Sequence, residues 1–162
     1  MSNISARPAD NMERIMGTYG NLLFRLCLIT LGNANDAEDA VQETFIKYLQ
    51  KAPAFRDAEH EKAWLLTVAT NQCRDMLRFR NRHSMINIEE INEFTGEQSH
   101  SGILEALMTL PEKFRMVLVL YYVEEYGMEE IAHIIGKSIS AVKMRLQKGR
   151  RLLREAYQKE YM

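Results

Sequence analysis

The last third of this 162-residue chain constrains its fold most, because two amphipathic helical patterns meet there at a glycine. Apolar residues recur at helical spacing over residues 128–135, which predicts one buried face. Gly136 ends this pattern, since glycine adopts the left-handed conformation at a helix end at little cost. Ser138 can cap a second helix, whose apolar positions are Val142, Leu146, Gly149 and Leu153. This predicts a helix-turn-helix, with the small Ala132 letting the two helices cross closely.

The second of these helices is strongly basic. No acidic residue occurs between residues 137 and 154, and the basic ones are Lys137, Lys143, Arg145, Lys148, Arg150, Arg151 and Arg154. On an isolated helix, such a run is as often a solvated face as a binding surface. On the second helix of a helix-turn-helix it indicates DNA binding, because the neutralisation of phosphates dominates affinity.

Composition narrows the class of protein. The formal net charge is −1, so the basic residues are segregated and the average charge hides them. Cys27 and Cys73 lack metal-ligand spacing, which fits unpaired thiols in a reducing compartment. The N-terminus lacks the apolar core of a signal peptide, and no window approaches about eighteen uninterrupted apolar residues. We therefore expect a cytoplasmic protein without membrane insertion, metal or cofactor.

Two helices are expected before residue 52. The first covers residues 10–31, where apolar residues repeat at intervals of three and four, with a break near Gly17 and Gly20. The second is expected to begin at Asn35, which has capping-box spacing with Glu38. It would run to Lys51 and turn Ala37, Val41, Phe45 and Tyr48 towards a core.

A loop over residues 52–60 and a helix over residues 61–82 complete the first half of the chain. Pro53 disfavours continuation of the preceding helix. The packing surface of the later helix would consist of Trp64, Leu65, Val68, Ala69, Met76 and Phe79. Its last turns contain Arg74, Arg78, Arg80 and Arg82 against Asp75 alone. This basic end either matches the helix dipole or contacts nucleic acid.

Residues 85–102 have a different composition, with Glu89, Glu90, Glu93 and Glu97 but no lysine or arginine. We expect a flexible acidic linker between two independently folded modules. Helical spacing then returns, and Thr109 with Glu112 has capping-box spacing around Pro111. No stretch shows sustained alternation at period two. The sequence thus predicts an all-α fold of two small helical domains, residues 1–84 and 103–162.

Five segments are more informative together than any of them alone. They are DAEDAVQETF (36–45), WLLTVATNQCRDMLR (64–78), LPEKFRMVLVL (110–120), EEIAHIIG (129–136) and SAVKMRLQKGRRLL (140–153). In this order and separation they resemble bacterial RNA polymerase sigma factors of the extracytoplasmic-function (ECF) group, in the sigma-70 family. The resemblance implies a non-enzymatic initiation factor whose partners are core RNA polymerase, promoter DNA and an anti-sigma factor. It would read the −10 element as single strand and the −35 element by its helix-turn-helix.

The resemblance implies a polymerase-binding surface as well. The helix that carries DAEDAVQETF would dock on the clamp of the polymerase through its exposed face, which is formed here by Asp39, Gln42, Glu43 and Ile46. A mostly acidic stripe with one apolar residue suits a basic coiled coil. The alternative is that Asp39 and Glu43 are ordinary solvated charges.

The downstream element would be held as single-stranded DNA by a loop and the helix that follows it. The residues implied by the resemblance are Phe55, Arg56, Asn71, Arg74 and Arg78. An aromatic plane and a cation in the loop suit an unstacked base, and arginines on the helix can hold phosphates.

The second helix of the helix-turn-helix would enter the major groove of the upstream element. With Val142 and Leu146 inward, its DNA-facing residues would be Ser140, Ala141, Lys143, Met144, Arg145, Gln147, Lys148 and Arg151. Lys143 and Gln147 can read base edges, whereas Arg145, Lys148 and Arg151 would hold phosphates. Ala141 and Met144 replace a threonine and a serine that are common in the family, so hydroxyl groups are missing from the reading surface.

Two other classes of function fit the sequence less well. An enzyme would need a catalytic constellation, but the four histidines are scattered and no phosphate loop or nucleophile elbow occurs. The other alternative is a stand-alone helix-turn-helix regulator whose first half binds a ligand or dimerises. Such a regulator should bind duplex DNA tightly alone, whereas a sigma factor should bind weakly until core polymerase is added.

Overall fold

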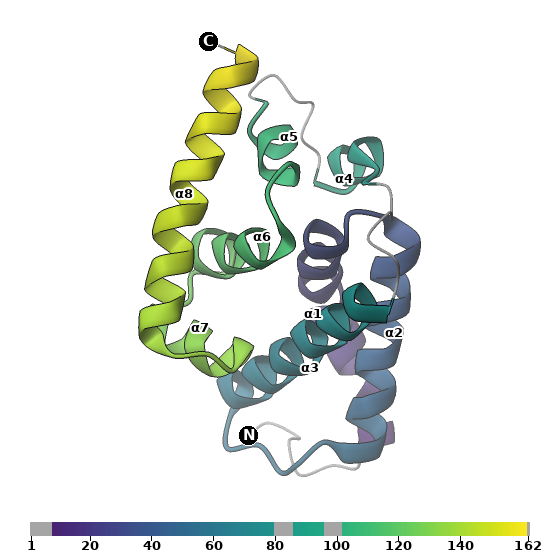
Figure 1. Cartoon of the computed structure of the whole chain (residues 1–162). Coiled ribbons are helices and arrows are strands. Elements are labelled where there is room, and N and C mark those ends of the chain that lie inside the picture. Colours follow the sequence, from purple (N-terminus) through teal and green to yellow (C-terminus); the bar gives the residue numbers. More distant parts are fainter. Residues whose placement is uncertain (1–7, 80–85, 96–101, 162) are drawn as a thin grey trace.

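The computed structural model describes residues 8–79, 86–95 and 102–161, and all regular structure within these ranges is helical. The helices are α1 (Pro8–Leu31), α2 (Ala34–Lys51), α3 (Ala58–Phe79), α4 (Ile88–Thr95), α5 (Ile103–Met108), α6 (Glu112–Leu118), α7 (Met128–Ile135) and α8 (Ile139–Tyr161), and α6 continues as a π-helical turn over Val119–Val123 (Figure 1). The predicted all-α fold is confirmed for the described residues. Helices α1, α2 and α3 form one group, and α8 runs along the opposite side of the molecule (Figure 1).

A buried carboxylate joins the three helices of the first group. Glu61 of α3 is fully buried and accepts hydrogen bonds from both terminal nitrogens of Arg14 of α1, at 3.1 and 2.8 Å. Tyr48 of α2 donates to the same carboxylate at 2.8 Å, and Tyr19 of α1 donates at 3.3 Å. Burial alone would raise the pKa of the Glu61 carboxyl group, but these donors outweigh burial and lower it. The network therefore fixes α1, α2 and α3 relative to one another.

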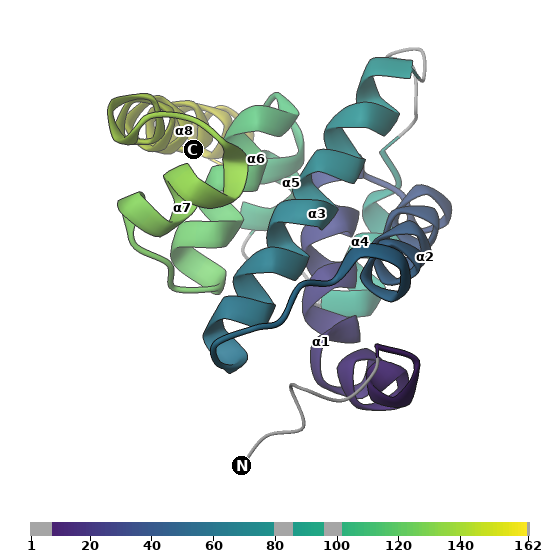
Figure 2. The ribbon, with the colours of Figure 1, turned by 90° about the horizontal axis from the view of Figure 1, so that it is seen from below.

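The beginnings of α1 and α2 differ from the sequence predictions. Helix α1 is uninterrupted through Gly17 and Gly20, so the predicted break is wrong, although the first turns lie at an angle to the rest (Figure 2). The N-cap of α2 is Asn33, not Asn35. The Asn33 side chain accepts from the backbone N–H of Asp36 at 2.9 Å and donates to its carboxylate at 3.0 Å. This reciprocal pair satisfies the helix end two residues earlier than the predicted capping box.

Two further predictions about helix ends are wrong. Phe79 is 84% exposed, because the packing face of α3 ends at Met76, the last buried residue of that helix. Thr109 does not cap α6: its hydroxyl donates to the carbonyl of Ala106 at 2.7 Å and so closes the end of α5. The N-cap of α6 is Pro111, whose missing N–H is not needed at a helix start.

The acidic segment contains a helix that packs on the first group. In α4, Ile91 is fully buried and the ring of Phe94 meets the ring of Phe24 in α1 edge-on, with 4.8 Å between centroids. The Glu90 carboxylate accepts a hydrogen bond at 3.0 Å from the first backbone N–H of α2, where an anion is favoured. The expectation of a flexible linker is therefore wrong for α4. Residues 96–101 of the linker lie outside the described ranges, and the proposed domain limits remain a prediction.

The C-terminal helices pack against the first group through α1–α6 and α3–α7 contacts (Figure 2). Arg115 of α6 is buried and donates to two carbonyls at the end of α1, those of Ile29 at 2.8 Å and Thr30 at 2.5 Å. Arg25 of α1 pairs with Glu124 at 2.7 Å. In this structure the two predicted modules therefore share an interface that contains several polar contacts.

The buried network around Glu61 predicts a pH-dependent stability. Because the folded-state pKa of Glu61 lies below its ordinary value of 4.5, its contribution is fully present above that pH and is lost as the pH falls through the folded value. We expect Glu61→Gln to lower the free energy of unfolding by about 1–3 kcal/mol at pH 7, since an uncharged amide replaces the carboxylate that accepts from the buried Tyr19 and Tyr48 hydroxyls and from the exposed Arg14. Urea unfolding between pH 3 and pH 7 measures both effects, with the exposed Glu59→Gln as control. Parallel pH curves for wild type and Glu61→Gln would contradict this assignment.

Candidate DNA and polymerase interface

The C-terminal helices form the helix-turn-helix predicted from the sequence. Gly136 follows α7 with a φ of +69°, the left-handed conformation that ends the helix. The hydroxyl of Ser138 accepts from the backbone N–H of Ala141 at 3.0 Å and so caps α8. Val142 and Leu146 are fully buried, which fixes the rotation of α8 about its own axis. The opposite side of α8 therefore faces solvent.

This exposed side of α8 carries the residues predicted to contact the upstream element. Ser140, Lys143, Met144, Gln147, Lys148 and Arg151 are exposed, and Ala141 and Arg145 are half-buried. A hollow of about 590 Å³ lies between α8 and the start of α6. Its lining consists of Ala141, Met144, Arg145, Gln147, Lys148 and Arg151, together with Lys113 and Phe114. Sequence reasoning missed Lys113, because only the packing of α6 against α8 brings it to this face.

The predicted downstream residues do not form one surface. Phe55 is only 7% exposed, and its ring stacks on Tyr48 at 6.0 Å and meets Trp64 edge-on at 5.8 Å between centroids. Arg56 is exposed next to the start of α3. The three helix residues, Asn71, Arg74 and Arg78, lie roughly 20 Å or more further along the axis of α3, at about 1.5 Å per residue. In this structure the Phe55 ring is packed in a core and is not open to a base.

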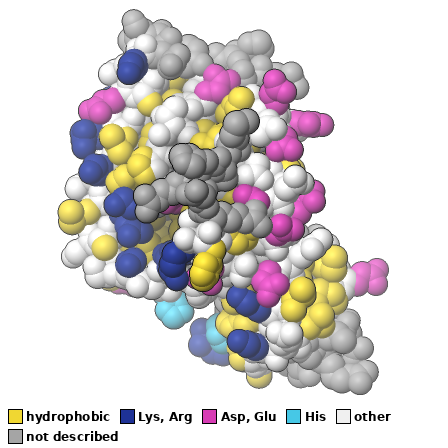
Figure 3. All heavy atoms as spheres, turned by 45° about the vertical axis from the view of Figure 1, so that its right-hand side comes forward, with side chains coloured by type: hydrophobic (Ala, Val, Ile, Leu, Met, Phe, Trp, Pro, Cys, Tyr) yellow, Lys and Arg dark blue, Asp and Glu magenta, His cyan; other side chains and the backbone are white. Residues whose placement is uncertain are grey.

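A basic pocket brings the end of α3 against the C-terminal helices. Its volume is about 380 Å³, and the residues that line it are Arg74, Leu77, Arg78, Glu112, Lys113, Met116, Lys137 and Arg145. Burial lowers the pKa of Arg74, and the neighbouring charges of Arg145 and Arg78 lower it further. Candidate residues for the two promoter elements therefore face each other across one pocket. Figure 3 shows lysine and arginine side chains gathered mainly on one side of the face it displays, and acidic side chains mainly on the other.

The stripe predicted to bind polymerase lies on the outer face of α2. Asp39, Gln42 and Ile46 are exposed, and Glu43 is half-buried. Leu49 is 45% exposed, much like Ile46 at 44%, so the stripe ends in two apolar residues. The sequence prediction missed Leu49, although its distance of three positions from Ile46 places both on one helix face.

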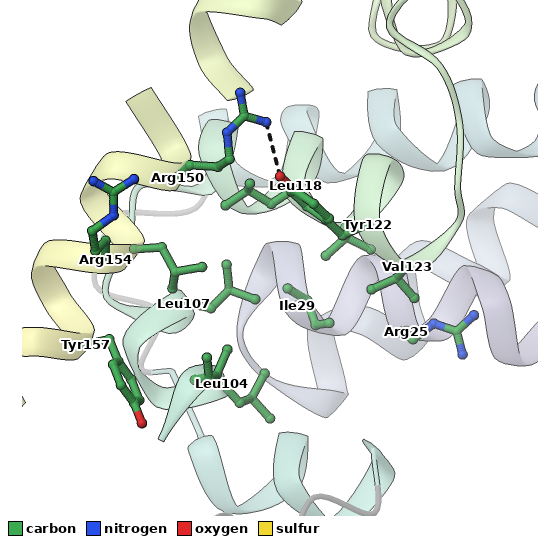
Figure 4. A pocket seen from close by; sticks show the side chains of 13 residues that line it. Arg25, Ile29, Leu104, Leu107, Leu118, Tyr122, Val123, Arg150, Arg154 and Tyr157 are labelled. Carbon is green, nitrogen blue, oxygen red and sulfur yellow. Dashed lines mark hydrogen bonds between the residues drawn. The ribbon is translucent and has the colours of Figure 1, made fainter. Parts of the chain in front are cut away.

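An apolar groove lies between α1, α5, the end of α6 and α8 (Figure 4). It has a volume of about 680 Å³, and aliphatic side chains form most of its lining. Arg25, Arg150 and Arg154 lie at its edge in Figure 4, and Arg150 donates to the Tyr122 hydroxyl at 3.1 Å. An apolar groove edged with cations suits an amphipathic helix that carries acidic residues. Its walls come from helices distant in sequence, so no sequence pattern located it.

The residues above are those of a helix-turn-helix protein that binds DNA, and comparison with known proteins gives its family. Residues 15–83 match Sigma-70 region 2, and residues 100–153 match Sigma-70, region 4. RNA polymerase sigma factor SigV of Bacillus subtilis is 30% identical over 85% of this chain and 85% of its own length. ECF RNA polymerase sigma factor SigW of the same organism is 28% identical over 90% of this chain and 88% of its own length.

Solved structures have a similar fold. The sigma factor RpoE, crystallised with the anti-sigma factor NepR from Bartonella quintana, superposes with a TM-score of 0.71 at 22% identity, covering 90% of this chain and 96% of that one. CnrH, solved in complex with the cytosolic domain of CnrY, gives a TM-score of 0.65 at 23% identity, covering 98% and 97%.

The chain belongs to the ECF sigma factors of the sigma-70 family, and it directs RNA polymerase to promoters. It is thus an initiation factor and not an enzyme. Within the described ranges, no helix is long and apolar enough to cross a membrane. Over the same residues, histidine, cysteine and acidic side chains form no group of three or more that could hold a metal ion.

Proposed function

We propose that this sigma factor acts in the cytoplasm and reads the two promoter elements with separate modules. The solvent-facing side of α8 reads the −35 element as duplex, and Asn71, Arg74 and Arg78 of α3 hold the −10 element as single strand. The observation that carries the first assignment is the fixed rotation of α8: Val142 and Leu146 are buried, so its basic and polar side points outward. In the loop before α3, the exposed Arg56 is the candidate DNA contact.

If each module reads one promoter element, the two modules must move apart when the protein binds the promoter. The −10 and −35 elements are roughly 25 base pairs apart, or about 85 Å at the rise of duplex DNA. Arg74 and Arg145, which belong to the two reading surfaces, line one pocket of about 380 Å³. We infer that the structure is a closed form of the free protein, and that binding to polymerase and DNA separates α3 from α7 and α8.

The outer face of α2 is the proposed site for core polymerase. Asp39 and Glu43 lie one helical turn apart, and Ile46 and Leu49 continue the same face. Acidic residues steer a basic partner to the site, and two exposed apolar residues give it area to bury. The stripe lies on a different helix from the candidate DNA contacts, so one protein can bind polymerase and DNA together.

We also propose an anti-sigma factor as a partner. RpoE, which has a similar fold, is bound by the anti-sigma factor NepR in its crystal structure. The apolar groove of Figure 4 combines residues of α1 with residues of α5, α6 and α8. A helix bound there would contact both modules and would therefore hold them in the closed form.

The distinguishing test uses the purified chain with and without core polymerase. We expect core polymerase subunits to co-purify with the tagged protein from cells, and we expect the protein alone to bind a pool of random duplex DNA weakly. Gel-shift titration of the pool, followed by sequencing of the bound fraction, should show selection only after core polymerase is added. Tight and selective duplex binding by the protein alone would support the stand-alone regulator instead.

The polymerase-binding stripe can be tested by charge reversal. The double variant Asp39→Lys, Glu43→Lys should weaken binding to core polymerase by about tenfold or more, because like charges would then face each other. Glu13→Lys is the matched control, since Glu13 is an exposed carboxylate on α1 and not on α2. Native-gel titration measures binding, and thermal unfolding verifies the fold. Equal affinities for the double variant and the control would remove the stripe from the polymerase interface.

Base reading and phosphate binding on α8 can be separated by salt dependence. Lys143→Ala should cost about 1–3 kcal/mol on the best promoter and relax preference at one position, because its amine meets a base edge. Lys148→Ala and Arg151→Ala should weaken all sequences alike, and each should lower the salt slope by roughly one unit, since each removes one cation from a phosphate. Holoenzyme binding to matched and randomised upstream elements at several salt concentrations measures both.

The buried Leu146 supplies the control for this experiment. Leu146→Ala should lower the free energy of unfolding by about 2–5 kcal/mol and affect binding only through stability. If Lys143→Ala weakens every sequence equally with a shallower salt slope, Lys143 contacts phosphate and the reading face of α8 is rotated from the one proposed.

A further inference from the structure

The basic pocket between the two modules has an unbalanced charge. Five of its eight lining residues are lysine or arginine, and one is a carboxylate. The cations come from four different segments: Arg74 and Arg78 from α3, Lys113 from α6, Lys137 from the turn before α8 and Arg145 from α8. Bringing like charges together costs free energy unless an anion balances them. The closed form therefore concentrates positive charge that neither module has alone.

Hydrogen bonding within the pocket is incomplete too. The Nη2 group of Arg74 is buried and donates no hydrogen bond, while Nη1 makes only a long contact of 3.4 Å to Asn71. Among the described residues, no carboxylate forms an ion pair with Arg74, Lys137 or Arg145, and Arg78 is paired only with its neighbour Asp75 at 3.4 Å. A buried guanidinium nitrogen without an acceptor is rare, because arginine has five donors to satisfy. A phosphate group would supply an acceptor for this nitrogen and would balance the other cations of the pocket.

The size and chemistry of the pocket select the ligand class. A volume of about 380 Å³ accommodates a small anion with two or more phosphate groups. Guanidinium groups bind phosphate oxygens in a bidentate manner, and lysine ammonium groups add charge. Leu77 and Met116 provide apolar wall on which a ribose or base could rest.

We propose that this pocket binds a small phosphate-bearing anion, of the pyrophosphate or nucleoside polyphosphate class, that bridges α3 and the helix-turn-helix in the closed form. The site requires only the observed packing of the two modules, so it does not depend on the promoter contacts proposed above. Where those contacts hold, the anion occupies Arg74 and Arg145 and competes with DNA for them.

Calorimetric titration of the full-length chain with sodium pyrophosphate tests the site, at an ionic strength held constant with sodium chloride. We expect saturable binding with one ligand per chain. Arg74→Gln on one module and Lys137→Gln on the other should each weaken it about tenfold, the loss of one charge-assisted hydrogen-bonding group. Lys51→Gln, at the exposed end of α2, should leave it unchanged. Thermal unfolding without ligand verifies that each variant is folded, and Lys137 is exposed, so its replacement should not disturb the fold.

The outcomes that overturn the proposal are distinct. If only one of the two variants weakens binding, or if Lys51→Gln weakens it equally, the site does not lie between the modules. Heat that does not saturate, or that chloride reproduces, indicates charge screening alone. A parallel titration with a single-stranded oligothymidylate separates the two sources of phosphate. If the oligonucleotide binds through Arg74 and Lys137 but pyrophosphate does not bind, the pocket is a binding site for DNA phosphates only, and the proposal is wrong.

Discussion

One buried guanidinium determines how the two halves of this sigma factor meet. Arg115 donates to the carbonyls of Ile29 and Thr30, at the end of α1, and to that of Leu110 before α6. The last carbonyls of a helix lack partners within it and carry the negative end of its dipole, so a cation is favoured there. Burial still opposes the charge and lowers the pKa of Arg115, and Glu112 only partly offsets this effect. In the open form proposed above, water can solvate both Arg115 and the end of α1, so this polar contact contributes little to the net free energy of closure.

Two further polar contacts across this interface are suited to reversible closure for the same reason. Arg25 pairs with Glu124 at 2.7 Å, and the ammonium of Lys62 lies 5.3 Å from the centroid of the Tyr126 ring. Each of these groups can be hydrated when the interface opens, unlike the aliphatic side chains of a permanent core. The network around Glu61 lies within the first group of helices, so separation of the modules leaves it intact. Stability of the first module and closure of the whole protein therefore rest on different interactions.

The sequence predicted the structural features that depend on local interactions. It missed those that depend on contacts between distant helices. Gly136 and Ser138 act within a few residues of themselves, and the helix-turn-helix formed as expected around them. The α4 helix was missed because its order comes from Ile91 and Phe94 packing on α1, whereas its acidic composition favoured a linker. The sequence placed Gly149 among the apolar positions of α8. A Cβ there would lie 3.3 Å from a methyl group of Leu118, so its absence also lets α6 and α8 approach closely. Pockets formed by several helices had no local signal at all.

The burial of Phe55 changes the role that the family resemblance implies for it. Its ring packs against Tyr48, Trp64 and His60, and burial of a phenylalanine side chain contributes about 1.5–3 kcal/mol. Stacking on an unpaired base returns about 1–3 kcal/mol. Moving Phe55 from its cluster to a base would thus exchange two similar free energies and add little affinity. Arg56 needs no such exchange, because it is already exposed, and its backbone N–H donates to the imidazole of His60 at 3.1 Å. In the downstream site proposed above, the buried ring of Phe55 therefore anchors the loop, and the exposed Arg56 beside it is the side chain available to DNA.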